Sequence, residues 1–326
     1  MDEIVCANTA FRYWRCPPQV RDLYPRLPNS EDGWRALSQA PFVTDVLKTP
    51  IIAVASPGCC NHHSGLRSTI RWEGASDAGT TIDTNLGFSV TNPLNTLFTM
   101  TRFVSQIDLV LAMYELCGWF SVFEPTPAVE MQLKIALKEN RNSSTQNLFE
   151  LGEGEDEIPW KRVYARTTVK VPANEGQTNN REDGREVTKL KGTSLWMRKP
   201  LIELSDLHRF AEKVKSQMWG KQFYDAAQQV IGIAASPLEV AGVLLLSRSR
   251  RLGGSGFRYV YLNDLTPLSE EAQSIAGQKV CYGDIVIVNP ILMKAAIIEI
   301  QGEVIHGSLE YQLHPNTSHI HPYMYG

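Results

Sequence analysis

The sequence lacks a membrane-length apolar run and any leader-like start. Its longest apolar stretches, Ile107–Met113 and Val240–Leu246, are far shorter than the roughly 20 residues that a spanning helix needs. The first residues, Met1-Asp2-Glu3, are acidic, whereas a secretory leader begins with positive charge followed by an apolar segment. We therefore expect a soluble, cytoplasmic protein with no membrane partner.

Cysteine is scarce, and its pattern excludes the usual frameworks. The chain has 6 cysteines without CxxC spacing, and Cys59 and Cys60 are adjacent. His62 and His63 follow this pair, but adjacent ligands cannot easily surround one tetrahedral zinc ion. The pattern disfavours zinc and predicts free thiols in a reducing cytoplasm.

The chain also has no excess of positive charge. Its formal net charge is −3 over 326 residues, which argues against a general basic coat for nonspecific nucleic-acid binding but permits local basic patches. The hydrophobic content of 43% and charged content of 21% are ordinary for a globular protein. The length predicts two or three domains with sizeable cores.

The N-terminal region, residues 1–137, has the pattern of a small α/β unit. An amphipathic helix is expected over Thr9–Arg15, ended by Pro17-Pro18. Three short strands are predicted at Ile51–Ala55, Ser68–Trp72 and Gly87–Val90. Two helices follow, one starting at Asn92-Pro93 and one over Ser105–Cys117 with Gly118 as its stop.

The middle of the chain is predicted to be irregular and then helical. Residues 138–192 are polar and rich in Gly and Asn, so we expect a flexible insertion around a short ordered piece near Trp160–Val171. Residues 193–234 are expected to form a helical connector, with helices at Asp206–Ser216 and Gln222–Ile231.

The C-terminal region, residues 235–312, predicts one helix and a three-stranded sheet. Ser236 and Pro237 form a strong helix start. Strands are expected at Phe257–Leu262, Val280–Val288 and Ala295–Ile300, the last two joined as a hairpin through Asn289-Pro290. The fold class is therefore mixed α and β, α+β, and residues 313–326 are expected to be an unstructured tail.

Two acids bracket the predicted hairpin. With a loop at 289–294, Val288 faces Ala295, and Asp284 faces Glu299. Directly opposed carboxylates repel, which a purely structural hairpin would tend to avoid. A divalent metal between them would turn this repulsion into attraction. The alternative is that both acids simply lie at the solvent-exposed end of the hairpin.

Other acidic and amide side chains extend this candidate metal site. Glu239 lies on the predicted helix, and Gln301 shares a strand face with Glu299. A helix acid, a strand acid and a triplet of an acid, any residue, and then an acid, Lys or Gln form the arrangement by which restriction-endonuclease-like folds hold Mg²⁺, which Mn²⁺ can replace. Gln301 is a weak ligand and no lysine sits beside Glu299, which counts against activity.

Several histidines are weaker candidates. His306 follows the acidic triplet and could serve as a general acid or a phosphate contact, or be an ordinary loop histidine. The tail histidines His314, His319 and His321 could bind a transition metal, but an unordered terminus is the better explanation.

Two basic clusters are candidates for nucleic-acid binding. Arg12 and Arg15 share a short helix with Phe11 and Trp14, so they could contact phosphate while the rings stack on bases, or the rings could pack a core. A second cluster consists of Arg248, Arg250 and Arg251. It could contact a DNA backbone or be a solvated helix end.

Six short segments, in order, carry a family resemblance. They are Thr9–Arg15, Ser89–Pro93, Tyr114–Gly118, Ala235–Glu239, Leu252–Phe257, and Gly283-Asp284 together with Glu299–Gly302. Together they resemble actinobacterial proteins with an AbiE antitoxin-like N-terminal region and a C-terminal domain like the very-short-patch-repair endonuclease. The resemblance implies a winged-helix-like or small α/β front and a restriction-endonuclease-like end. It maps the nuclease acids onto Glu239, Asp284 and Glu299.

The chain departs from this pattern at Gln301, where the family has a second acid, and in its tail, where the family continues with a helix and a strand. Three functions follow as hypotheses. The first is a Mg²⁺-dependent DNA endonuclease or its degenerate descendant. The second is an antitoxin-like, DNA-binding transcriptional regulator with a toxin-like protein partner. The third is an interaction protein with a relict nuclease fold.

Overall fold

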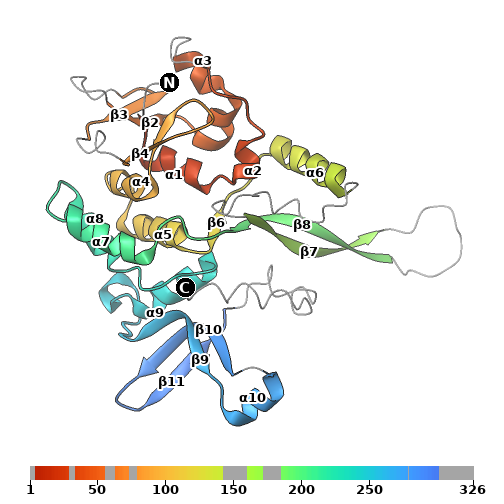
Figure 1. Ribbon diagram of the computed structural model, residues 1–326, viewed down its shortest axis with the longest axis vertical. Coiled ribbons are helices and arrows are strands. Elements are labelled where there is room, and N and C mark those ends of the chain that lie inside the picture. Colours follow the sequence, from red (N-terminus) through yellow and green to blue (C-terminus); the bar gives the residue numbers. More distant parts are fainter. Residues whose placement is uncertain are drawn as a thin grey trace, which may run out of the picture.

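The computed structural model describes residues 4–28, 34–55, 63–72, 79–141, 160–171, 185–277 and 279–300. It contains both helices and strands, arranged around three sheets, so the predicted α+β class is confirmed (Figure 1). In these described ranges, no helix is long and apolar enough to cross a membrane. The described cysteines Cys6, Cys16, Cys117 and Cys281 are free thiols, as predicted.

A five-stranded mixed sheet organises the N-terminal unit, in the order β3-β2-β1-β5-β4. Its strands are β1 (Ile4–Val5), β2 (Ile51–Val54), β3 (Arg67–Ile70), β4 (Thr81–Asp83) and β5 (Ser89–Thr91). The three predicted strands are confirmed as β2, β3 and β5. The other two, β1 and β4, were not predicted because segments this short show no alternation of apolar and polar residues.

Helices surround this sheet. They are α1 (Ala7–Arg15), α2 (Pro18–Arg21), α3 (Trp34–Gln39), the π-helix η2 (Val43–Leu47), α4 (Pro93–Met100) and α5 (Gln106–Cys117). The three predicted helices are confirmed as α1, α4 and α5, whereas α2, α3 and η2 were not predicted. Asn92 caps α4 by accepting a 2.9 Å hydrogen bond from the amide of Asn95. Gly118 follows α5, as predicted, and Pro18 begins a new helix in addition to following α1.

A long hairpin projects from the body of the molecule (Figure 1). Strands β6 (Phe120–Val122), β7 (Lys161–Val171) and β8 (Arg185–Met197) form an antiparallel sheet in the order β6-β8-β7, and α6 (Pro127–Arg141) precedes β7. The expected ordered piece near Trp160–Val171 is confirmed as β7. The predicted insertion boundaries at 138 and 192 are wrong, because they fall within α6 and β8, and residues 185–192 pair with β7.

The C-terminal unit has the predicted core of one helix and three strands. It contains α9 (Pro237–Ser247), the 3₁₀ turn η4 (Arg250–Leu252), β9 (Val260–Pro267), α10 (Glu270–Ala276), β10 (Val280–Asn289) and β11 (Lys294–Ile298). The sheet order is β11-β10-β9, all antiparallel. The helix α10 was not predicted from the sequence.

The helical connector joins the N-terminal and C-terminal units through one hydrophobic core. Its helices are α7 (Leu204–Val214) and α8 (Gly220–Ala227). A single buried cluster contains Met113 of α5, Phe223 of α8, Val243 of α9 and Ile285 of β10. The buried Tyr114 hydroxyl also donates to the carbonyl of Gln229 at 3.0 Å. The predicted border at 234/235 therefore does not separate two cores.

Candidate functional site

The hairpin register brings two of the predicted acids to neighbouring strands. Val288 pairs with Ala295, and the ladder ends at Ile285 opposite Ile298, so the predicted pairing of the hairpin is confirmed. Asp284 precedes Ile285 on β10, and Glu299 directly follows Ile298, the last residue of β11. Asp284 is half-buried and Glu299 is exposed. This arrangement places both carboxylates at the same end of the hairpin.

Asp284 holds the chain where the regular ladder stops. Its Oδ2 accepts a 2.7 Å hydrogen bond from the backbone amide of Ile300. The carboxylate therefore replaces a strand-to-strand hydrogen bond and is fixed in orientation. Its second oxygen, Oδ1, has no hydrogen-bond partner among the described residues. Gln301, the remaining predicted member of the site, lies outside the described residues.

Glu239 is buried at the start of α9, with only 6% of its surface exposed. Its Oε1 accepts the hydroxyl of Ser236 at 2.9 Å, and its amide donates back to that hydroxyl oxygen at 3.2 Å. This is a Ser-x-x-Glu capping interaction. Its Oε2 accepts from the amide of Ala235 and from Nδ2 of Asn263, both at 2.8 Å. Glu239 thus has a structural role whatever else it does.

The electrostatics of this buried carboxyl link it to Asp284. Burial raises the pKa of Glu239, hydrogen bonds from Ala235, Asn263 and Ser236 lower it, and the negative charge of Asp284 raises it further. The net direction is upward, so desolvation outweighs the three donors. Glu239 and Asp284 are therefore close enough to influence each other electrostatically.

Asn263 is a site residue that sequence reasoning missed. It lies in β9 with a positive φ of 49°, a conformation that asparagine tolerates better than most residues. Its amide also donates to the carbonyl of Ile233 at 2.9 Å. Its only sequence signal is a polar residue directly after the apolar run Tyr259–Leu262. It fastens the start of α9 to β9.

The candidate ligands are carboxylate oxygens, which suit Mg²⁺ or Mn²⁺ better than Zn²⁺ or Cu²⁺. Within the described ranges, no group of three or more His, Cys, Asp or Glu side chains is placed to hold a metal ion. Both oxygens of Glu239 already accept hydrogen bonds, so the other carboxylates of the candidate site are those of Asp284 and Glu299. Mg²⁺ commonly binds one or two carboxylates and retains several waters.

The N-terminal arginines are already engaged within the fold. Arg12 donates to the carbonyl of Leu47 at 2.8 Å, and burial lowers its pKa. Arg15 forms a 2.8 Å ion pair with the buried Glu115 and lies 5.1 Å from the ring centre of Phe11. Phe11 itself is buried in the core. These contacts favour the core-packing interpretation of this helix.

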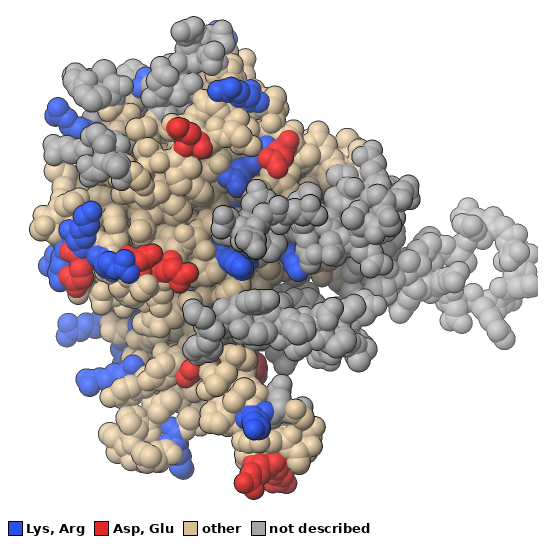
Figure 2. Space-filling view, in the orientation of Figure 1, with Lys and Arg blue, Asp and Glu red and all other residues tan. Residues whose placement is uncertain are grey.

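The second basic cluster divides between a packed and an exposed part. Arg248 donates to Oε1 of Gln229 at 3.0 Å. Arg250 and Arg251 are exposed on η4. Figure 2 shows basic and acidic groups interspersed over the visible described surface. A contact with a DNA backbone would rest on Arg250 and Arg251.

The histidine and zinc candidates are largely outside the described part of the chain. Cys59, Cys60, His62 and His306 lie there, as do the tail histidines. His63 is described, and its Nδ1 lies 2.7 Å from the hydroxyl of Ser68. That contact gives the ring a local structural partner.

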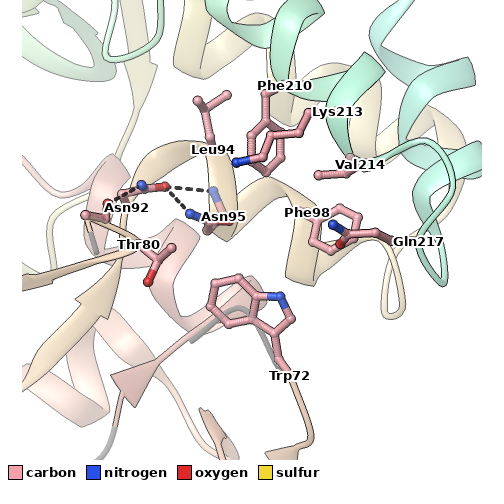
Figure 3. A pocket seen from close by; sticks show the side chains of 11 residues that line it. Trp72, Thr80, Asn92, Leu94, Asn95, Phe98, Phe210, Lys213, Val214 and Gln217 are labelled. Carbon is pink, nitrogen blue, oxygen red and sulfur yellow. Dashed lines mark hydrogen bonds between the residues drawn. The ribbon is translucent and has the colours of Figure 1, made fainter. Parts of the chain in front are cut away.

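A separate pocket of about 250 Å³ lies between the start of α4 and α7 (Figure 3). Trp72, Asn92, Phe98, Lys213 and Gln217 are among the residues that line it. None of the predicted site residues does. Its volume falls below the roughly 300–1,000 Å³ of typical small-molecule sites, so we assign it no ligand.

Comparisons of the chain with protein-family models, with curated proteins and with solved structures found no match. The resemblance to antitoxin-like and very-short-patch-repair-like proteins therefore stays a prediction from the short segments. The geometry of the described residues carries the functional proposal.

Proposed function

We propose that the C-terminal unit is a divalent-metal-dependent, DNA-endonuclease-like domain, either active or catalytically degenerate, in a cytoplasmic protein. Asp284 and Glu299 would hold Mg²⁺ or Mn²⁺. The supporting observation is the register of β10 and β11, whose last pair is Ile285 with Ile298. Asp284 directly precedes Ile285 in the chain, and Glu299 directly follows Ile298.

Each acid has a distinct role in this proposal. Asp284 is oriented by the Ile300 amide and presents Oδ1. Glu239 adds a buried carboxyl. Burial and the charge of Asp284 raise the pKa of Glu239, so a nearby cation would be favoured electrostatically. Gln301 would position water or substrate. A bound divalent ion would lower the pKa of water and stabilise negative charge on a phosphate.

Calorimetry with Mn²⁺ tests the metal site. Asp284→Asn and Glu299→Ala should each weaken Mn²⁺ binding at least tenfold. The matched control is Glu271→Gln, because Glu271 is an exposed carboxylate of the same unit, on α10, and this change should leave binding intact. Nicking of a supercoiled plasmid in Mg²⁺ then separates an active enzyme from a degenerate one. Absence of Mn²⁺ binding by the wild type would refute the proposal and leave the relict, interaction-protein hypothesis.

The antitoxin-like regulator remains the second hypothesis, but the structure supplies no observation in its favour. It depends on Arg12 and Arg15, and both guanidinium groups contact other parts of the fold. A salt-sensitive gel shift that is abolished by Arg12→Ala plus Arg15→Ala, in protein shown to be folded, would restore it.

A further inference from the structure

The outer part of the β7–β8 hairpin is a long two-stranded ribbon. Its pairing is unbroken from Tyr164 opposite Gly192 to Val171 opposite Arg185. At about 3.4 Å per residue, this stretch is about 24 Å long. Figure 1 shows it extending away from the sheets of the molecule. We call residues 164–171 and 185–192 the outer ribbon.

The outer ribbon is strongly basic within an acidic chain. It contains five basic residues and one acidic residue, Glu186, for a formal net charge of +4, so the rest of the chain carries −7. The basic residues are Arg166, Lys170, Arg185, Lys189 and Lys191. Across the ladder, only Lys170 lies opposite an acid. In this register the other four basic residues have no acid at the paired position.

The root of the hairpin is firmly attached to the body. Arg162 forms a 2.6 Å ion pair with Glu130 of α6, and its side chain is only 5% exposed. The fully buried Trp196 donates to the carbonyl of Phe123 at 3.1 Å. A bulge between Arg162 and Tyr164 separates this root from the outer ribbon. A fixed root reduces the entropy lost when the ribbon binds a partner.

We propose that the outer ribbon docks in the major groove of double-stranded DNA. This inference rests on the proposed function in taking DNA as the ligand, but it does not require metal or cleavage. The major groove of B-form DNA is about 12 Å wide and admits a two-stranded β-ribbon. Lysine and arginine would neutralise phosphates on both sides of the groove. The same strands carry Thr167, Thr168 and Thr188, a residue type whose hydroxyl group can bond to base edges.

Fluorescence anisotropy with a 30-base-pair DNA duplex, in EDTA, tests this docking with the full chain. The arm variant carries Arg166→Gln, Lys170→Gln, Lys189→Gln and Lys191→Gln. The control variant has the same charge change at four other sites, Arg35→Gln, Lys48→Gln, Lys213→Gln and Lys221→Gln, which are all exposed. The arm variant should bind at least tenfold more weakly. The slope of log Kd plotted against log salt concentration should fall by about 0.9 for each lost phosphate contact. The Kd of the control variant should stay within twofold of the wild-type value.

A variant with added positive charge keeps the proposal testable even if the arm variant is unfolded. Thr168→Lys should tighten binding several-fold and steepen the salt slope. Wild-type protein that does not bind DNA, or an arm variant that binds like the control, would overturn the inference. Equal affinity for an RNA duplex would also overturn it, because the deep, narrow major groove of RNA excludes a ribbon. A further contrary outcome is that the arm variant loses self-association while its DNA affinity is unchanged. If DNA binding depends on the outer ribbon but the protein does not bind Mn²⁺, only the proposed metal site is refuted.

Discussion

The side-chain amide of Asn263 donates a 2.8 Å hydrogen bond to the carboxylate of Glu239, across 24 positions of sequence. This bond joins the start of α9 to β9 in the interior of the C-terminal unit. The same amide reaches the carbonyl of Ile233, so one side chain binds both the helix start and the segment before it. The candidate metal site is built on this junction.

Asn263→Asp should be strongly destabilising, because it removes a buried donor and places two carboxyl groups together. We expect a loss of about 3 kcal/mol at pH 8, and a smaller loss at pH 5, where one of the two can be protonated. Urea denaturation measures both values. The matched control is Asn289→Asp, where the exposed side chain only accepts the amides of Ile291 and Leu292, and it should change stability by less than about 0.5 kcal/mol.

Tyr114 should make stability depend on pH in the alkaline range. Burial raises its pKa from 10.0 to about 12, partly offset by the amide of Ile231. The unfolded chain therefore loses this proton first, and the contribution of Tyr114, complete below pH 10, declines as pH rises through about 12.

Tyr114→Phe removes this pH dependence, so the difference in stability between wild type and the variant reports the contribution of the Tyr114 hydroxyl. Wild type should exceed the variant by about 1 kcal/mol at pH 8, because the hydroxyl makes two hydrogen bonds. That advantage should shrink by up to about 1.4 kcal/mol per pH unit between pH 10 and 12. Tyr259→Phe, at an exposed position, should show no such trend. An advantage that grows with pH would contradict the assignment.

Arg15→Ala should weaken the fold rather than act on a free basic surface. The change leaves Glu115, which is buried, with donors only from Ser121 and Val122. We expect a loss of about 2 kcal/mol by urea denaturation, reduced from the fully buried case because the Arg15 side chain is 31% exposed. The exposed Arg251→Ala should cost less than about 0.5 kcal/mol. Equal, negligible effects of the two changes would mean that the Arg15–Glu115 pair contributes nothing to stability.

Gly118→Ala should disrupt the contact between α5 and the segment before α9. A Cβ atom at this position would lie 2.6 Å from the carbonyl oxygen of Tyr114 and 2.7 Å from that of Ala234. Backbone must move to accommodate it, at a cost of about 2 kcal/mol or more. Gly65→Ala, where a Cβ meets no atom within 4 Å, is the control. Thermal unfolding should show a clear drop in Tm only for the first variant.

Elements that are specified by neighbouring residues, such as turns and helix caps, could be predicted from the sequence. The Asn289-Pro290 break and the two-residue alternation on either side were enough to predict the hairpin register. The Ser236 cap was enough to predict the start of α9. The two-residue β1 and the polar β8 were not predicted, because each pairs with a strand that is distant in sequence.

The candidate site shows the same division between local and distant determinants. Asp284 and Glu299 could be brought together from spacing alone. The hydrogen bond from Asn263 to Glu239 could not, because it depends on a positive φ inside a strand and on a helix 24 positions away. Glu239 also shows that one acid can satisfy two patterns. Its position fits both a metal-ligand series and a Ser-x-x-Glu cap, and the cap is what the geometry displays.

The shared core has a consequence for how such a chain can be divided or recombined. Phe223 and Met113 belong to the same buried cluster as Val243 and Ile285, so residues 235–300 bury part of their apolar surface against helices encoded much earlier. A gene fusion that transferred only this segment would expose that surface and yield an aggregation-prone fragment. Transfer of the unit to another protein would therefore have to bring α5, α7 and α8 with it, or replace the surface that they provide.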